Sequence, residues 1–168
     1  DTAKAIGIII ENPEFADVRS LEGVAPTKNH AVFTIAVPTT AGTGSEVTPY
    51  SILTLHKEKT KKSFSCLDSF FKVAFLDGRY TVSLPLQVAR NTAVDAMCHL
   101  IEGYTNKKSS PSSDYIALEG LKIIGKHLNS LENGSLDVEA CTELLWASTL
   151  GGIVISQTGT TIVHSRGK

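Results

Sequence analysis

Apolar residues in the first half of the chain occur in short runs separated by polar loops, a pattern that predicts α/β structure. Residues 2–11 form an apolar stretch that predicts a short helix. Residues 31–37 and 72–77 are short, continuous and apolar, as in the buried strands of a parallel or mixed sheet covered by helices. Residues 49–56 are a further candidate strand, and the charged stretch 57–62 predicts a loop or hairpin turn.

The second half of the chain has the apolar period of helices. Helices are expected over 85–106, over 113–131 and from 136 to about 157. The pair Gly151-Gly152 lies inside the third helix and indicates close packing against a neighbour or a kink. We therefore expect a boundary near residue 84, with α/β structure before it and helices after it.

Composition narrows the class of protein. The 168 residues are 42% hydrophobic and 20% charged, which excludes a disordered chain and is typical of a globular one. The net charge of −1 argues against a nucleic-acid partner, and no apolar run reaches the roughly 18 residues of a membrane span. Cys66, Cys98 and Cys141 are scattered and predict reduced thiols in the cytoplasm.

The clearest candidate chemistry lies on the first helix of the second half. Asp95 and His99 are four residues apart, so their side chains leave the helix on one face, which Glu102 shares. A carboxylate oxygen and an imidazole nitrogen suit Fe²⁺ or Zn²⁺. Taken alone, however, the spacing favours a hydrogen bond between two ordinary helix residues. Glu102 either orients a metal ligand or is a surface charge, and we favour the surface.

A second candidate is the loop TTAGTGSE at residues 39–46, directly after a predicted strand. Its small residues allow backbone N–H groups to approach a phosphate, and its threonines add donors. The loop has neither a nucleotide-triphosphate motif nor G-x-G-x-x-G, and a plain turn is the alternative. Among the histidines, His30, His56 and His127 are expected at the surface, while the context GTTIVH leaves the role of His164 open.

Taken together and in this order, the motifs resemble a known family. IAVPTTAGTGSEVT, KVAFLD, NTAVDAMCHLIEGYTN and GTTIVH are similar to blocks of the iron-containing (group III) alcohol dehydrogenases, which have dehydroquinate-synthase-like architecture. The resemblance implies a partial Rossmann-like α/β domain followed by a partial all-α domain. Residues 1–84 would be the C-terminal part of the NAD(P)-binding domain, and 85–168 the N-terminal part of the helical metal-binding domain.

The resemblance also implies roles for individual residues. Asp95, His99 and His164 match metal ligands, with Fe²⁺ as the expected metal and Zn²⁺ as the alternative. The residues that match contacts of NAD or NADP are Thr39, Thr40, Thr43, Thr48 and Lys62, with Lys61 as an alternative to Lys62. The family's glycine-rich pyrophosphate loop and its fourth metal ligand are expected beyond the two ends of this sequence, which we interpret as the central part of a longer enzyme. If the protein consists of these residues alone, we expect weak or no catalysis and an exposed apolar surface where the missing parts would pack.

The expected activity is a metal-dependent, NAD(P)-linked interconversion of an alcohol and an aldehyde or ketone by hydride transfer. The implied partners are a small-molecule alcohol or aldehyde and further copies of the chain, with no nucleic acid and no membrane. Two alternatives stay open: a related enzyme such as a glycerol dehydrogenase or maleylacetate reductase, and a catalytically incompetent fragment.

Overall fold

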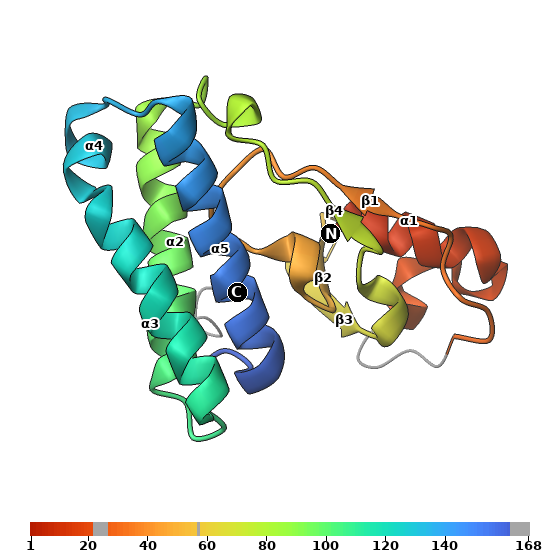
Figure 1. Cartoon of the computed structure of the whole chain (residues 1–168). Helices are drawn as coiled ribbons and strands as arrows, with labels where there is room; N and C mark the ends of the chain where they lie inside the picture. Colours follow the sequence, from red (N-terminus) through yellow and green to blue (C-terminus); the bar gives the residue numbers. More distant parts are fainter. Residues whose placement is uncertain (22–26, 57, 162–168) are drawn as a thin grey trace.

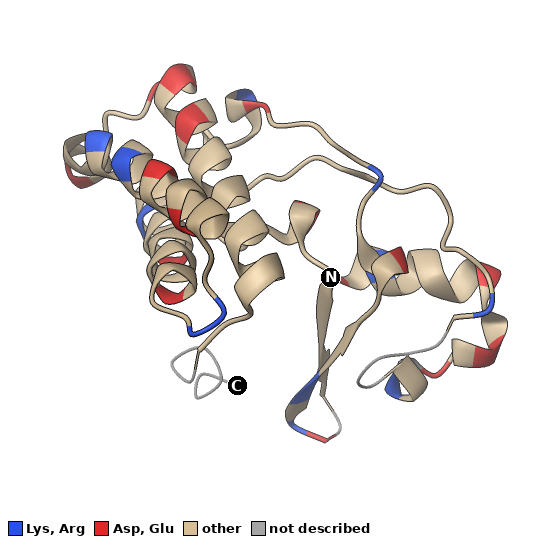
Figure 2. Cartoon of the chain, turned by 60° about the horizontal axis from the view of Figure 1, so that its bottom comes forward, with Lys and Arg blue, Asp and Glu red and all other residues tan. Residues whose placement is uncertain are grey.

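The computed structural model describes residues 1–21, 27–56 and 58–161 and shows two lobes joined side by side. One lobe is α/β and contains the N-terminus, and the other is a bundle of helices (Figure 1). The change from one to the other falls between β4 (Val73–Ala74) and α2 (Leu86–Tyr104). Figure 2 shows Lys, Arg, Asp and Glu intermixed over both lobes, so neither lobe presents a surface of one charge.

The helical lobe is built from three long helices and one short one. Leu100 of α2, Ala117 of α3 and Leu145 of α5 are fully buried at its centre, so the apolar faces predicted from the sequence meet as expected. Of the described helices, α5 alone is long and apolar enough to cross a membrane, yet 67% of the relevant window is buried inside the fold. The other elements of this lobe are α3 (Pro111–Lys126), α4 (Leu128–Asn133) and α5 (Val138–Thr158).

The helix expected over 113–131 is in fact two helices, because the chain breaks at His127. Helix α3 begins two residues earlier, where Ser110 and Ser113 form a reciprocal capping box. His127 was expected at the surface and is 7% exposed instead. Its Nε2 lies 2.5 Å from a carboxylate oxygen of Glu143 on α5, and this contact explains how a polar ring is accommodated at the break.

The α/β lobe contains a helix, a parallel strand pair and a hairpin. Strands β1 and β4 are parallel, with Ile35 opposite Val73, which agrees with the predicted parallel or mixed sheet. Strands β2 and β3 are antiparallel, so half of the charged stretch expected to be a turn belongs to β3. A small core contains Ile8 of α1 and Phe64 of β3. The elements of this lobe are α1 (Thr2–Glu11), β1 (Ile35–Ala36), β2 (Tyr50–Leu55), β3 (Thr60–Ser65) and β4 (Val73–Ala74).

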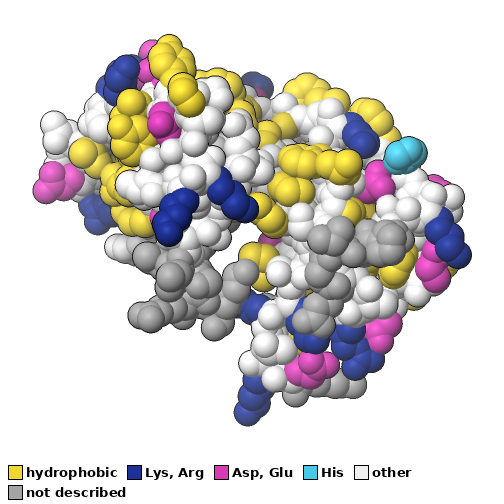
Figure 3. All heavy atoms as spheres, turned by 90° about the horizontal axis from the view of Figure 1, so that it is seen from below, with side chains coloured by type: hydrophobic (Ala, Val, Ile, Leu, Met, Phe, Trp, Pro, Cys, Tyr) yellow, Lys and Arg dark blue, Asp and Glu magenta, His cyan; other side chains and the backbone are white. Residues whose placement is uncertain are grey.

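The two strands predicted to be buried are short and largely exposed. Phe33 is 69% exposed, Ile35 52% and Phe75 57%, so the prediction of burial is wrong for these segments. The physical reason is that β1 and β4 form a sheet of two strands, which leaves apolar side chains without cover. Figure 3 shows exposed hydrophobic side chains on both lobes.

The loop after β1 joins the two lobes. Ala41 of this loop is part of the apolar core of the helical lobe. Gly44 has φ of +57° and lies so close to α5 that an added Cβ would be 2.6 Å from Cα of Gly152. Beside it, the hydroxyl of Thr149 donates to Oε1 of Glu46 at 2.7 Å, and both side chains are buried. The prediction that Gly151 and Gly152 mark close packing is confirmed, since Gly152 contacts Gly44 and Gly151 lies against α2.

Replacing Gly44 with alanine tests this contact. The added methyl group would meet the backbone of α5 at a residue that also has a left-handed conformation, so we expect the free energy of unfolding to fall by about 2–4 kcal/mol. Gly125→Ala is the matched control, because a Cβ there meets nothing within 4 Å and alanine favours a helix by about 0.5–1 kcal/mol. Urea unfolding measures the free energy of unfolding of both variants and of the wild type. Equal losses in the two variants would contradict the proposed role of the contact.

Candidate functional site

A cleft of about 450 Å³ lies between the two lobes. Seen from below in Figure 3, the molecule is hollowed between them. The wall from the helical lobe carries Asp95 and His99, and the opposite wall carries hydroxyl and apolar side chains of the connecting loop and the hairpin. The complete lining is Asp1, Thr43, Ser45, Thr48, Tyr50, Ile52, Ser63, Asp95, His99, Ile155 and Thr160.

Asp95 and His99 face the cleft from successive turns of α2, as their spacing predicted. The side chain of His99 is 6% exposed and that of Asp95 is 35% exposed, so one is anchored and the other reaches solvent. His99 Nε2 and Asp95 Oδ1 are 4.0 Å apart, which is longer than a direct hydrogen bond. Donors bind Zn²⁺ at about 2.0–2.2 Å, so the two atoms lie within reach of one ion. The donor set therefore fits a divalent metal.

Lys4 supports the opposite wall of the cleft. Its Nζ donates to the carbonyl oxygens of Thr48 and Tyr50, both at 2.8 Å, and lies 5.6 Å from the ring centroid of Phe71. Burial lowers the pKa of Lys4 to about 8, and the nearby Glu46 carboxylate opposes that change. Lys4 thus fixes the backbone at the start of β2, where Thr48 lines the cleft.

Asp1 also lines the cleft, although it was not predicted as a site residue. Its Oδ1 accepts from the hydroxyl of Ser45 at 3.0 Å, and its Oδ2 from the backbone N–H of Ile52 at 3.2 Å. The available signal was the D-x-A-K pattern at the start of the chain, since Asp1 and Lys4 contact the same loop and strand. Tyr50, Ser63 and Ile155 carried no such signal, because only folding brings them to the cleft.

The predicted cofactor residues divide into two groups. Thr43 and Thr48 line the cleft with the metal-ligand pair. Thr39 and Thr40 lie at the start of the same loop, outside the lining, and Lys62 lies on β3 opposite Leu53, next to the lining residue Ser63. The structure thus brings the loop to one cleft with Asp95 and His99, the two predicted metal ligands of α2.

The predicted ligand His164 lies outside the described residues, so its position stays a prediction. In the described parts of the chain, no group of three or more His, Cys, Asp or Glu side chains is placed to hold a metal. Glu102 was favoured as a surface charge, and this is wrong, since it is 7% exposed. Its Oε2 accepts hydrogen bonds from Thr161, which draws the carboxylate inward.

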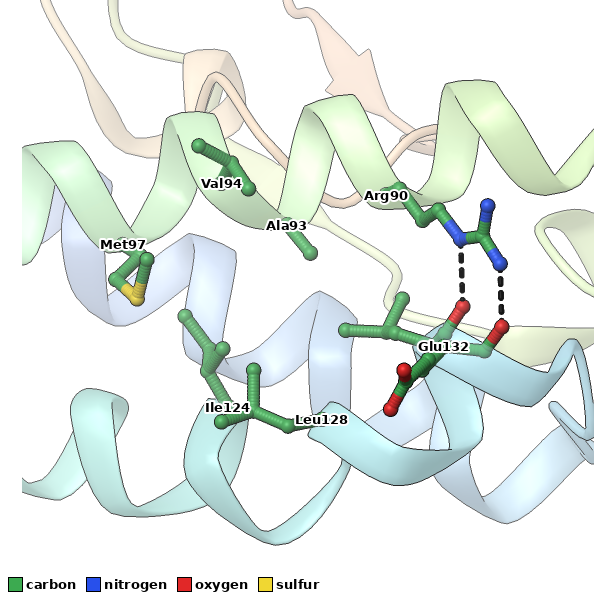
Figure 4. A pocket seen from close by; sticks show the side chains of 8 residues that line it. Arg90, Ala93, Val94, Met97, Ile124, Leu128 and Glu132 are labelled. Carbon is green, nitrogen blue, oxygen red and sulfur yellow. Dashed lines mark hydrogen bonds between the residues drawn. The ribbon is translucent and has the colours of Figure 1, made fainter.

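A second pocket lies within the helical lobe, between α2, α3 and α4. Its walls are apolar side chains such as Val94, Met97 and Leu128 (Figure 4). Arg90 at its edge donates to the backbone carbonyls of Leu131 and Glu132, so its guanidinium is engaged with the end of α4. This pocket lacks the convergent polar groups of the cleft, and we assign the functional site to the cleft.

Both lobes match models of a known protein family. The family model described as iron-containing alcohol dehydrogenase matches residues 1–78, and the model of the C-terminal domain of the same family matches 89–166. The chain is 39% identical over 166 residues to lactaldehyde reductase of Escherichia coli, covering 98% of this chain and 42% of that protein. It is 33% identical to an NADPH-dependent butanol dehydrogenase of Clostridium saccharobutylicum, with the same coverage.

Solved structures agree with these matches. An iron-containing alcohol dehydrogenase of Thermotoga maritima is 40% identical with a TM-score of 0.81, covering 98% of this chain and 44% of that one. An alcohol dehydrogenase of Oenococcus oeni is 29% identical with a TM-score of 0.89, covering 98% and 42%. The chain thus spans about two fifths of the length of the proteins it matches.

The buried ammonium of Lys4 predicts a dependence of stability on pH. Between about pH 8 and the ordinary value of 10.5, the unfolded chain holds a proton that the folded chain releases. Stability should therefore rise over this window, by about 1–3 kcal/mol from this group alone. Lys4→Met removes the rise and also lowers stability, because the carbonyls of Thr48 and Tyr50 lose their donor.

The measurement is the difference in unfolding free energy between wild type and K4M as a function of pH. Lys122→Met, which removes an exposed lysine of α3, is the control for the loss of one positive charge. If the unfolding free energies of wild type and K4M change in parallel between about pH 8 and 10.5, Lys4 does not cause the pH dependence of stability.

Proposed function

Because the chain belongs to the iron-containing alcohol dehydrogenase family, we propose that it forms the active-site core of a metal-dependent, NAD(P)-linked oxidoreductase. The reaction is the interconversion of an alcohol and an aldehyde or ketone. The observation that carries this proposal is the position of Asp95 and His99 across one cleft from Thr43 and Thr48. A metal-binding pair and a candidate cofactor loop are thereby held on facing walls.

Asp95 and His99 are the residues that would hold the divalent metal, with His164 as the proposed third ligand. Fe²⁺ is the metal that the family name implies, and Zn²⁺ suits the same donors. When bound, the metal supplies a Lewis acid for the substrate oxygen and the nicotinamide supplies or accepts the hydride. Burial of the His99 ring restricts its rotation, so the imidazole is directed at the cleft before any ligand arrives.

The cofactor side of the site comprises Thr39, Thr40, Thr43, Thr48 and Lys62. We assign NAD or NADP to this wall, because the exposed hydroxyl groups of Thr39 and Thr43 and the ammonium of Lys62 are donors for phosphate and ribose oxygens. The loop that carries Thr43 is fixed by its packing on α5, and Thr48 is fixed by Lys4. Rigid walls of this kind hold cofactor and substrate at reacting distance, which supplies part of the rate.

The cleft also indicates the substrate class. Its apolar lining residues are Ile52 and Ile155, and its volume of about 450 Å³ is shared with the nicotinamide end of the cofactor. A small aliphatic alcohol or aldehyde fits this space, in keeping with the relatives named for lactaldehyde, butanol and methanol. We further propose self-association and a cytoplasmic location, the latter supported by three free cysteines.

The domain boundary near residue 84 is likewise part of the proposal. It is supported by the gap between the two family-model matches, which end at residue 78 and resume at 89. On this view residues 1–84 contribute the cofactor wall of the cleft, and residues 85–168 contribute the metal wall.

Replacing His99 with alanine tests the function. Since an imidazole ligand is lost from the site, we expect the affinity for Fe²⁺ or Zn²⁺ to fall more than about 100-fold and the NAD(P)H-dependent reduction of aldehydes to disappear. His56→Ala, an exposed histidine after β2, is the matched control and should change neither. Metal content after dialysis measures the first effect, and NAD(P)H oxidation with lactaldehyde, butanal and formaldehyde measures the second. Reduction of maleylacetate, or oxidation of glycerol with NAD(P)⁺, tests the two related enzymes. Full metal binding and activity in H99A would overturn the assignment.

A further inference from the structure

Lys4 is a buried lysine of α1 that contacts the wall of the cleft at Thr48. It is 2% exposed, and three oxygen atoms surround its ammonium group. The carbonyl oxygens of Thr48 and Tyr50 accept from Nζ at 2.8 Å each, and the hydroxyl oxygen of Thr48 accepts at 3.3 Å. The three N–H groups of the ammonium therefore meet three acceptors, which offsets the cost of burying the charge.

The contact with the Thr48 hydroxyl decides where the hydroxyl proton points. An ammonium group can only donate, so Oγ1 of Thr48 accepts from Lys4 and the hydroxyl proton turns away from it. Thr48 lines the cleft and is 4% exposed. Among the described residues this proton has no acceptor, so it is available to an oxygen atom of a ligand in the cleft.

Loss of a proton from Lys4 reverses this hydrogen bond. A neutral amine keeps two N–H groups and gains a lone pair. The carbonyl oxygens of Thr48 and Tyr50 can only accept, so they keep the two N–H groups, and the lone pair is left facing the Thr48 hydroxyl. The hydroxyl then donates to Nζ, and it presents lone pairs to the cleft in place of its proton.

We propose that Lys4 is a positioning residue that makes the Thr48 hydroxyl a donor to the cofactor when Lys4 is protonated and an acceptor when Lys4 is neutral. The proposal rests on the proposed function, in which Thr48 belongs to the cofactor wall of the cleft. Lys4 itself touches neither substrate nor cofactor in this assignment. An oxygen atom of NAD or NADP at Thr48 therefore gains a hydrogen bond at low pH and loses it at high pH.

The surroundings of Lys4 bring this change into an accessible range of pH. Burial lowers the pKa of Lys4 to about 8, against the effect of the Glu46 carboxylate on the connecting loop. The amino group of Asp1 is the charged group that faces Lys4 from its own helix. Strand β2 faces it with backbone carbonyls, and the carboxylate of Asp68, on the turn packed against α1, is paired with His30.

The test is the dissociation constant of NADH and of NADPH, measured by fluorescence titration as a function of pH. In the wild type we expect it to rise about threefold to tenfold between about pH 7 and about pH 9.5, because one hydrogen bond to the cofactor is lost. The stability of the protein is expected to rise above about pH 8. A purely structural role of Lys4 would therefore not weaken binding in this range.

Three variants isolate the hydroxyl from the lysine. Thr48→Val removes the hydroxyl and keeps both carbonyl contacts of Lys4, so binding should be about threefold to tenfold weaker at neutral pH and independent of pH. Thr48→Ser keeps the hydroxyl and should retain the wild-type pH profile. Lys4→Met should also remove the pH dependence, and T48V keeps the proposal testable if K4M does not fold. Lys122→Met, which removes an exposed lysine of α3, is the matched control and should follow the wild type.

The proposed reversal and the proposed function fail in different ways. A dissociation constant that rises equally with pH in wild type and T48V overturns the role of the hydroxyl. A wild-type constant that does not change with pH overturns the role of Lys4 and leaves the proposed function in place. If neither NADH nor NADPH binds to the wild type at neutral pH, the proposed function fails and this inference fails with it.

Discussion

The structure depends on the close approach of the loop after β1 to the helical lobe. At Gly44 and Gly152 two backbones come so near that neither position has room for a side chain. Ala41 extends the apolar core of the helices into the loop, and the buried hydrogen bond from Thr149 to Glu46 closes the contact. Because this loop connects β1 to the hairpin, its contact with α5 sets the distance between the walls of the cleft.

This contact gives the small residues of TTAGTGSE a packing role beside any phosphate contact. Gly42 also packs closely, since an added Cβ would lie 2.8 Å from Cβ of Thr92 on α2. The glycines and the alanine thus face the helices, while Thr39 and Thr43 stay exposed and available to a ligand. A single loop contacts both lobes, so its packing links the proposed cofactor wall of the cleft to the proposed metal wall.

Buried charged groups stabilise the same arrangement from three directions. Lys4 ties α1 to the start of β2, Glu46 ties the loop to α5, and Glu102 ties α2 to the segment after α5. Each pairs with backbone or hydroxyl groups distant in sequence, which offsets the cost of removing a charge from water. Of the three, the contact between Glu46 and Thr149 joins the connecting loop to the helical lobe and so helps to specify how the lobes are placed. The contacts of Lys4 and Glu102 each act within one lobe.

The sequence by itself determined the α/β character of the first half, the helical character of the second half and the shared face of Asp95 and His99, because these follow from local periodicity. It did not determine the burial of β1 and β4, which depends on how many strands cover them, nor the break at His127. The inward position of Glu102 was also missed, since its partner Thr161 is 59 residues away in the chain. Only the tertiary structure decided that the threonine loop shares one cleft with Asp95 and His99, because that requires the packing of Gly44 on α5.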